Sequence, residues 1–248
     1  MILRRLGNKK RIAEKIQQFF PEHTTYIEPF FGAGGMFFYK PKAKYNIMND
    51  VDSEVFNLFF ILQQVPDEFE KSWFEMPIHI DLWKHWKKNK ETDPVKKAVR
   101  FVMLSNWGFM GKPQTMRLGE CNTKKIVLDN IEMTQKLLWD VAFSNADFRE
   151  LLKKVNVRNK KRAFIYCDPP YLATNNNYSE GFKESDSNDL FDYLVQSEIR
   201  FAMSEFDHPF ILEQAEKRGL NLIKIGERRN ISNRRMEVLV TNYDQDEV

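Results

Sequence analysis

The tetrapeptide Asp168-Pro169-Pro170-Tyr171 is the part of the sequence that points most sharply to chemistry. Two successive prolines fix a stiff, extended turn, because each ring restricts its own φ angle and the conformation of the preceding residue. The Asp168 carboxylate and the Pro169 carbonyl then form two acceptors that can bind both hydrogens of an exocyclic amine. The Tyr171 ring can stack on a planar base. The tetrapeptide therefore predicts a site for the amino group of a nucleobase.

A glycine-rich turn and an acidic residue indicate a second, nucleoside-binding function. The turn reads Gly32-Ala33-Gly34-Gly35, and glycines allow positive φ angles and a close approach of the backbone to a ligand. Asp50 follows at nearly the spacing of about 20 residues at which an acid binds ribose hydroxyls in dinucleotide-binding folds. An ordinary strand-to-helix turn and a helix cap are the alternatives. Together the two features favour a cofactor that contains a nucleoside.

These residues need a sheet to bring them together, and the sequence predicts one. Apolar runs typical of strands alternate with amphipathic stretches typical of helices, both before residue 60 and after residue 141. The strongest strand candidate, 163–167, is apolar throughout, as in a buried parallel sheet, and directly precedes Asp168. The other expected strands are 26–27, 45–48, 141–143, 201–203, 222–225 and 238–243. This alternation predicts an α/β fold with helices on both faces of the sheet and ligands at the carboxyl ends of the strands.

Residues 61–140 differ in character from the segments on either side. The stretch 80–104 has helical periodicity and is rich in lysine, and a turn-rich segment follows at 106–113. We therefore expect one catalytic domain, formed by residues 1–60 and 141–248, with an inserted, mostly helical lobe over 61–140.

Composition limits the class of protein. The 248 residues are 42% hydrophobic and 29% charged, near the average for globular proteins, which excludes a disordered chain. Two cysteines and four scattered histidines exclude a disulfide scaffold and give no reason to expect a metal. The sequence has neither an apolar run of about 18 residues nor the apolar core of a signal peptide, so we expect a cytoplasmic protein. The net charge of +3 permits a nucleic-acid partner without demanding one.

The motifs, in this order, resemble those of the Dam, or D12, class of DNA adenine-N6 methyltransferases, which have a Rossmann-like sheet. Residues 168–171 match the catalytic motif of that class, and 28–34 match its methionine-binding motif. Asp50 falls where the family has its ribose-binding acid, and 145–148 resemble the segment that contacts the cofactor adenine. Residues 233–243 resemble the last strand of the family. The resemblance covers both ends of the chain and leaves the middle lobe unmatched.

The resemblance implies S-adenosylmethionine as the cofactor. Near the N-terminus, Arg5 stands where the family has an aromatic residue, and Asn8 replaces a glycine, which a turn accepts because asparagine tolerates left-handed conformations. Lys9 is retained as a charge partner for the methionine carboxylate. The expected cofactor-binding residues are Arg5, Lys9, Glu28, Pro29, Phe30, Gly32, Gly34, Asp50, Asp147, Phe148 and Asp168.

The implied reaction is direct transfer of the sulfonium methyl group to adenine N6. The N6 lone pair is delocalised into the ring, so acceptors at Asp168 and Pro169 would favour a pyramidal nitrogen with a freer lone pair. The target adenine is buried in duplex DNA and must be flipped out. The base would then stack on Tyr171, with Tyr178 closing the pocket.

The partner that the resemblance implies is double-stranded DNA, bound by a monomer. Cations for the phosphates lie near the C-terminus, and the loop 106–117 holds donors and acceptors that suit base edges in the major groove. The expected DNA contacts are Asn106, Lys112, Arg117, Tyr178, Arg229, Arg234 and Arg235.

Other functions stay open at this stage. RNA adenine or cytosine N4 could accept the methyl group, since ribosomal-RNA enzymes also place Asp-Pro-Pro-aromatic after a strand, although the motif order and the inserted lobe favour DNA. A nicotinamide dehydrogenase fits Asp50 but leaves residues 168–171 unexplained. The intact tetrapeptide argues against a catalytically silent DNA-binding relative.

Overall fold

The computed structural model describes residues 2–5, 7–109, 111–172, 182–229 and 234–247 of the chain. Its central sheet consists of β1 (Thr25–Glu28), β2 (Tyr45–Asn49), β5 (Ala142–Ser144), β6 (Ala163–Cys167), β7 (Arg200–Phe206), β8 (Asn221–Arg229) and β9 (Arg234–Thr241). The seven strands lie in the order β5-β2-β1-β6-β7-β9-β8. The first five in this order are parallel, whereas β9 runs antiparallel to both β7 and β8. The predicted α/β fold is confirmed, and its sheet is mostly parallel.

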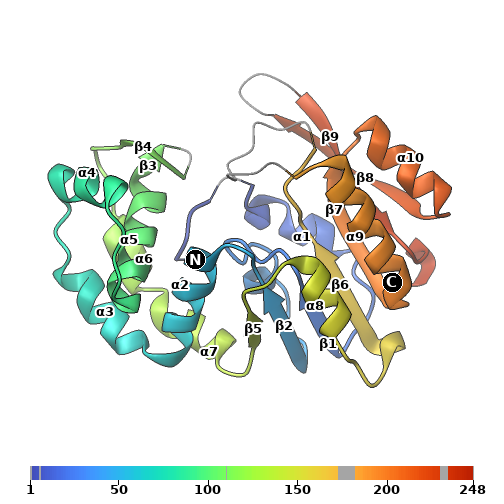
Figure 1. The fold of residues 1–248 in the computed structure, drawn as a ribbon, viewed down its shortest axis with the longest axis horizontal. Coiled ribbons are helices and arrows are strands. Elements are labelled where there is room, and N and C mark those ends of the chain that lie inside the picture. The colour runs from blue at the N-terminus through green and yellow to red at the C-terminus, as the bar shows by residue number, and fades with distance from the viewer. Residues whose placement is uncertain (1, 6, 110, 173–181, 230–233, 248) are drawn as a thin grey trace.

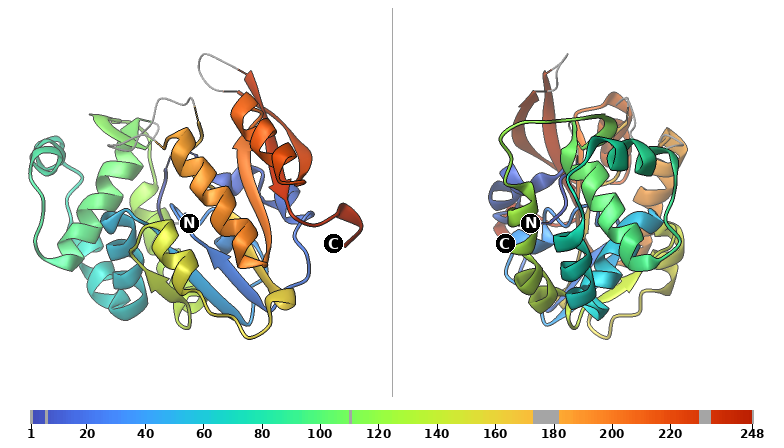
Figure 2. Two further views of the ribbon diagram at one scale, coloured as in Figure 1. Left: turned by 45° about the vertical axis from the view of Figure 1, so that its right-hand side comes forward. Right: turned by 90° about the vertical axis from the view of Figure 1, so that its left-hand side faces the viewer.

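Helices cover both faces of this sheet (Figure 1). They are α1 (Ala13–Gln17) and α2 (Ser53–Gln64) on one face, and α8 (Phe148–Lys154), α9 (Glu184–Ser197) and α10 (Pro209–Lys217) on the other. Neighbouring residues of a strand point to opposite faces. Tyr26 of β1 accordingly packs in one apolar cluster with Ile16 and Leu58, whereas Ile27 packs in a second with Leu190. Figure 2 shows α8 and α9 side by side over the parallel strands. Among the described residues, no helix is long and apolar enough to span a membrane.

A mostly helical lobe lies between α2 and β5 in the chain, beside the β5 edge of the sheet (Figure 1). It consists of α3 (Pro66–Glu75), α4 (Ile80–Lys88), α5 (Pro94–Trp107), α6 (Thr123–Leu128), α7 (Ile131–Leu138) and a hairpin of β3 (Gly108–Phe109) and β4 (Lys112–Met116). Phe69, Trp73 and Trp107 of the lobe belong to the same apolar cluster as α1 and α2. The lobe is therefore packed firmly on the sheet domain.

The stretch 80–104, which was expected to be helical throughout, is interrupted between α4 and α5. Pro94 begins α5, where its missing N–H costs nothing, and the Asp93 side chain accepts from a backbone N–H of the first turn. The buried Arg100 side chain donates to two backbone carbonyls near the end of α4, at 2.9 and 2.8 Å. The helix also continues through Asn106, where the sequence indicated a turn.

Candidate active site at the carboxyl ends of the parallel strands

The expected site residues follow the carboxyl ends of β1, β2 and β6, which meet at one edge of the sheet. Glu28 is the last residue of β1, Asp50 follows β2, and Asp168 follows β6. The chain order of the strands changes direction between β1 and β6, and open α/β sheets bind ligands at such a switch point. The structure therefore brings together the three segments that were predicted to bind the cofactor and the amine.

Asp50 is hydrogen bonded directly to the glycine-rich turn. Its Oδ2 accepts from the Gly32 N–H at 2.7 Å, and its Oδ1 accepts from the Asp52 N–H at 2.9 Å. Gly32 has a φ of +55°, and a Cβ atom there would have no neighbour within 4 Å, so this backbone faces open space. Burial raises the pKa of Asp50 to about 6, although the nearby Arg5 guanidinium opposes the shift. An acid and an open backbone turn thus form one unit, as expected for a nucleoside site.

Lys9 contacts the tetrapeptide as well as the glycine turn. Gly35 leaves room for this approach, because a Cβ atom on it would collide with the Asn8 side chain and the Lys9 backbone nitrogen. The Lys9 side chain is only 3% exposed, and its Nζ lies 2.5 Å from Asp168 Oδ1. Nζ also lies 4.6 Å from the centre of the Tyr171 ring. A cation therefore sits between the predicted cofactor site and the predicted amine acceptor.

Two buried carboxyl groups that the sequence analysis missed hold the end of the tetrapeptide. The Tyr171 hydroxyl donates to Glu237 Oε1 at 2.8 Å, and the Leu172 N–H donates to Glu205 Oε2 at 3.3 Å. Burial, with the nearby Asp168 carboxylate, keeps the pKa of Tyr171 well above its usual value, so its hydroxyl remains a donor. The available signal was an acidic residue with an apolar neighbour in each of two strands, Glu205 before Phe206 in β7 and Glu237 before Val238 in β9.

Glu205 is expected to make stability depend on pH. Burial raises its pKa from 4.5 to about 8, so over this range the folded protein holds a proton that the unfolded chain releases. Stability therefore falls as the pH rises, at a limiting slope of about 1.4 kcal/mol per pH unit. Glu205→Gln removes this titration. Urea unfolding between about pH 5 and pH 8 should show the wild type losing stability relative to the variant as the pH rises. A constant difference across this range would contradict the assignment.

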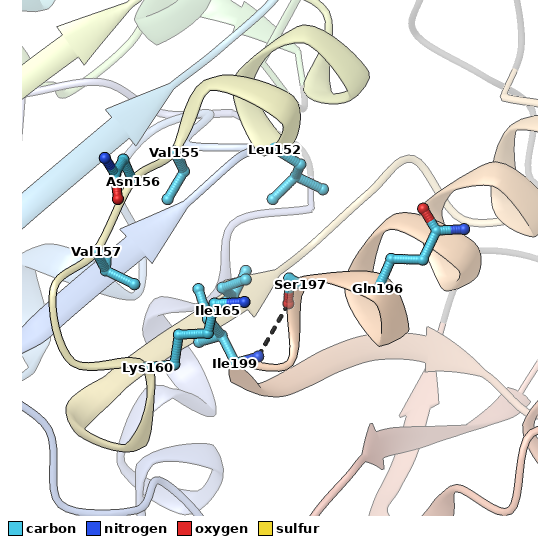
Figure 3. Close-up of a pocket in the computed structure, with 9 residues that line it drawn as sticks. All are labelled: Leu152, Val155, Asn156, Val157, Lys160, Ile165, Gln196, Ser197 and Ile199. Atoms are coloured by element: carbon cyan, nitrogen blue, oxygen red, sulfur yellow. Dashed lines mark hydrogen bonds between the residues drawn. The ribbon is translucent and has the colours of Figure 1, made fainter.

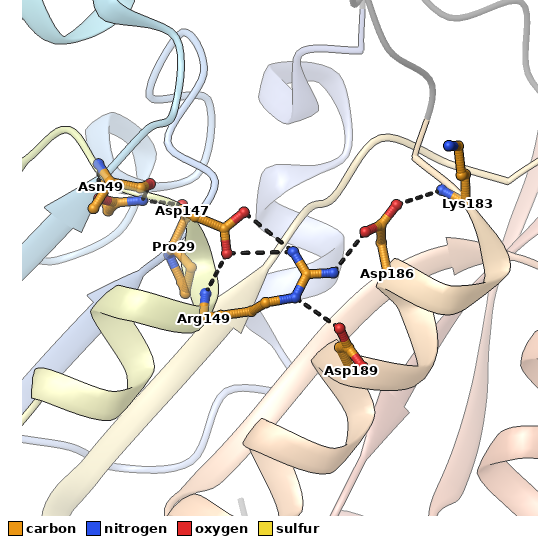
Figure 4. A network of polar contacts seen from close by, with 8 residues as sticks. Pro29, Asn49, Asp147, Arg149, Lys183, Asp186 and Asp189 are labelled. Atoms are coloured by element: carbon orange, nitrogen blue, oxygen red, sulfur yellow. Dashed lines mark hydrogen bonds and ion pairs between the residues drawn. The ribbon is translucent and has the colours of Figure 1, made fainter.

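Asp147 and Phe148, expected beside the cofactor adenine, begin α8 next to the glycine turn. The Phe148 ring centre lies 5.4 Å from that of Phe30. Asp147 caps α8 by accepting from the Arg149 N–H at 2.8 Å. The Arg149 guanidinium also pairs with Asp147, and with Asp186 and Asp189 of α9 at 2.6 and 2.7 Å (Figure 4). This network fixes α8 to α9 beside the expected adenine pocket.

The remaining residues of the 28–34 segment shape the turn. Glu28 is buried and accepts from the Tyr26 hydroxyl at 2.9 Å, and burial raises its pKa well above the usual value. The Pro29 carbonyl accepts from the Asn49 amide at 3.0 Å. A Cβ atom on Gly34 would collide with the Phe38 ring, so only glycine fits there. Arg5, which stands where the family has an aromatic residue, forms an ion pair with Asp52 at 2.7 Å.

The prediction that Asn106 contacts DNA is wrong. It is 4% exposed, its amide donates to the Ile2 carbonyl at 2.8 Å, and its Oδ1 accepts from the Arg4 N–H at 2.7 Å. It therefore anchors the N-terminal segment and cannot reach a base. Arg117 is exposed after the hairpin, and Arg235 donates to the Leu172 carbonyl at 3.4 Å. Tyr178 and the side chains of Lys112, Arg229 and Arg234 lie outside the described residues.

A cavity of about 200 Å³ lies at the opposite end of the sheet (Figure 3). It is lined by Leu152, Val155, Asn156, Val157, Lys160, Ile165, Gln196, Ser197 and Ile199. Lys160 precedes β6 and Ile199 precedes β7, which places the cavity at the amino ends of these parallel strands. It is therefore separate from the site that follows β6.

The chain belongs to the D12 class N6 adenine-specific DNA methyltransferases, because the model of that family matches residues 6–233. The DNA adenine methylase of Escherichia coli strain K12 is 25% identical to it, over 91% of this chain and 87% of its own length. The modification methylase StsI of Streptococcus sanguinis is 24% identical, over 96% of this chain and 42% of its own length. Among solved structures, the rRNA methyltransferase aviRa of Streptomyces viridochromogenes has a TM-score of 0.40 at 12% identity, covering 93% of this chain and 84% of its own.

Family membership confirms the predicted class of enzyme. The protein is a DNA methyltransferase that acts on N6 of adenine, and its cofactor is S-adenosylmethionine. The roles of individual residues remain predictions.

Proposed function

We propose that the protein methylates an adenine flipped out of double-stranded DNA, with Asp168, Pro169, Pro170 and Tyr171 as its amine-binding residues. One observation carries this assignment: Asp168 directly follows the buried strand β6 at the switch point of the sheet, beside the glycine turn and Asp50. An amine acceptor and a nucleoside site lie next to each other there. Methyl transfer requires this adjacency, because donor and acceptor must be held in line.

The residues around the turn suit S-adenosylmethionine, which supplies an electrophilic methyl group on a positively charged sulfur. Each oxygen of Asp50 accepts from one backbone N–H and keeps a lone pair for a ribose hydroxyl. The buried Lys9 ammonium provides a cation for the carboxylate of the methionine part. The rings of Phe30 and Phe148 offer an apolar wall for the adenine.

The amine-binding residues act on the lone pair of N6. Asp168 and the Pro169 carbonyl accept its two hydrogens, and Tyr171 stacks on the base. The lone pair then attacks the methyl carbon, so that a nitrogen–carbon bond forms while the carbon–sulfur bond breaks. The nitrogen becomes cationic, the nearby Asp168 carboxylate stabilises that charge, and the proton leaves to Asp168 or to water. Acceptors fixed where positive charge develops are the main source of the rate increase.

The helical lobe supplies the specificity in this proposal. Residues 1–60 and 141–248 form the catalytic domain, and 61–140 read the DNA. Lys112, Arg117, Tyr178, Arg229, Arg234 and Arg235 are the proposed DNA contacts. The enzyme acts as a monomer in the cytoplasm, where its DNA substrate is found.

Arg117→Ala is expected to weaken DNA binding and relax sequence preference, since one base-reading arginine is worth about 1–3 kcal/mol. The KM for DNA should rise about tenfold or more, while the affinity for S-adenosylmethionine stays unchanged. Arg158→Ala is a matched control, because Arg158 is exposed between α8 and β6, at the opposite end of the sheet. A loss of cofactor affinity alone in Arg117→Ala would refute a base-reading role.

Methyl transfer from radiolabelled S-adenosylmethionine tests the proposal directly. Unmethylated duplex DNA and RNA are offered separately, and the labelled base is identified after hydrolysis. We expect label in N6-methyladenine of DNA. Label in RNA or at cytosine N4 would retain the chemistry and overturn the proposed substrate.

A further inference from the structure

Glu237 is a buried carboxylate that the chemistry described above does not use. It lies on β9, opposite Phe206 of the antiparallel strand β7, and is 1% exposed. The next residues of the strand, Val238, Leu239 and Val240, are apolar and buried. A carboxylate in such surroundings is costly unless it is paired, so its partners indicate its purpose.

Within the described part of the chain, the Glu237 side chain contacts Tyr171 of the proposed amine site and Lys9 beside it. Its Oε1 accepts from the Tyr171 hydroxyl at 2.8 Å, and the same oxygen lies 3.5 Å from Lys9 Nζ. Lys9 Nζ is in turn 2.5 Å from Asp168 Oδ1. One oxygen atom of β9 therefore links the residue that would stack on the base to the cation that touches the amine acceptor.

We propose that Glu237 is a positioning residue for methyl transfer, which fixes the Tyr171 ring and shares the Lys9 ammonium with Asp168. This inference rests on the proposed function of residues 168–171.

Three contacts with described residues hold the Tyr171 ring. Its hydroxyl is bound to Glu237, its ring meets Phe206 edge to face at 4.7 Å between centres, and Lys9 Nζ lies over it. Of these three contacts, only the hydrogen bond to Glu237 holds the hydroxyl end of the Tyr171 side chain. A tyrosine held in this way presents one defined surface to a flipped base, and small misplacements of such groups reduce rates strongly.

Glu237 also affects how strongly the Lys9 ammonium acts on the Asp168 carboxylate. Lys9 Nζ lies within 3.5 Å of both carboxylates, and without Glu237 its positive charge would act more strongly on Asp168. Asp168 would then be a weaker acceptor for the two amine hydrogens. Both effects concern the reacting geometry rather than cofactor binding, so they should lower kcat more than they raise the KM for S-adenosylmethionine.

The test is a double-mutant cycle that combines Glu237→Gln with Tyr171→Phe and measures the kcat of each variant. Glutamine removes the charge but keeps an acceptor, whereas phenylalanine removes only the hydroxyl. Each single variant should lower kcat about tenfold, with the KM for S-adenosylmethionine within about twofold of the wild type. The double variant should lie within about threefold of the slower single variant, because both changes break one contact.

Glu205→Gln provides the matched control cycle. Glu205 is an equally buried carboxyl group of the neighbouring strand, but it binds the Leu172 backbone rather than the Tyr171 hydroxyl. In the double variant of Glu205→Gln and Tyr171→Phe, the fold-losses of kcat of the two single variants should therefore multiply, as for independent sites. Thermal unfolding of every variant separates loss of activity from loss of fold.

Each outcome decides for or against the inference. The inference would be overturned if the kcat losses of Glu237→Gln and Tyr171→Phe multiplied in the double variant, or if Glu237→Gln left kcat unchanged. Either result would leave the proposed function intact. A wild type that forms no N6-methyladenine in DNA would defeat the proposed function and, with it, this inference. Where Glu237→Gln fails to fold, an unchanged kcat in Tyr171→Phe overturns the inference, and a tenfold loss at unchanged KM supports it.

Discussion

Asp168→Asn is expected to lower the kcat of DNA methylation by about 10²–10³-fold, the range found when one preorganised electrostatic contact is removed from an active site. The amide retains one acceptor oxygen, but its NH₂ group presents hydrogens to an amine that is itself a donor. The negative charge that stabilises the cationic nitrogen is lost as well. Initial rates with labelled S-adenosylmethionine, at saturating cofactor and DNA, measure this loss.

Asp189→Asn is the matched control for that experiment. Asp189 also pairs with a basic side chain, since its Oδ2 lies 2.7 Å from Arg149 Nε, but it lies on α9 rather than at the amine site. Its replacement should affect the unfolding temperature more than kcat. Because Asp168→Asn also removes one of the charged partners of the buried Lys9, its unfolding temperature must be measured too. A folded Asp168→Asn variant with kcat within about threefold of the wild type would refute the proposed role.

The sequence predicted the positions of the main motifs because each depends on local chain chemistry. A fully apolar run at 163–167 is typical of a buried parallel strand, so the placement of Asp168 at its carboxyl end followed from pattern alone. The same holds for Asp50 after β2 and for the glycines after β1. Parallel strands then bring these ends together without further information.

Contacts between segments far apart in the sequence could not be predicted in this way. The Lys9–Asp168 pair joins residues separated by 159 positions, and the Tyr171–Glu237 bond joins residues separated by 66. A shift of the β9 pairing register by one residue would have turned Glu237 to the other face of the sheet. Asn106 was assigned to a DNA-reading loop because the asparagine, glycines and proline within 106–113 indicate turns. Its real partners, the backbone groups of residues 2 and 4, leave no local signal.

Asp50→Asn is expected to raise the Kd for S-adenosylmethionine about 10- to 100-fold, as for hydrogen bonds to a charged group. Gly32 and Asp52 both direct an N–H at the Asp50 carboxylate, and an amide can satisfy only one of them. Its NH₂ group would face the other donor, so the turn and the ribose contacts are both disturbed. Equilibrium binding of S-adenosylhomocysteine, which cannot react, gives the Kd without turnover.

The pH dependence of that Kd separates an ionised acceptor from a merely structural one. The pKa of Asp50 is raised by burial to about 6, so the carboxylate becomes protonated as the pH falls through this value. A protonated carboxyl has fewer acceptor sites for ribose hydroxyls. The wild-type Kd should therefore rise below pH 6, by up to about tenfold per pH unit, whereas the Kd of Asp50→Asn should be nearly independent of pH. Equal affinities of the wild type and Asp50→Asn at neutral pH would refute the assignment of Asp50 to the ribose.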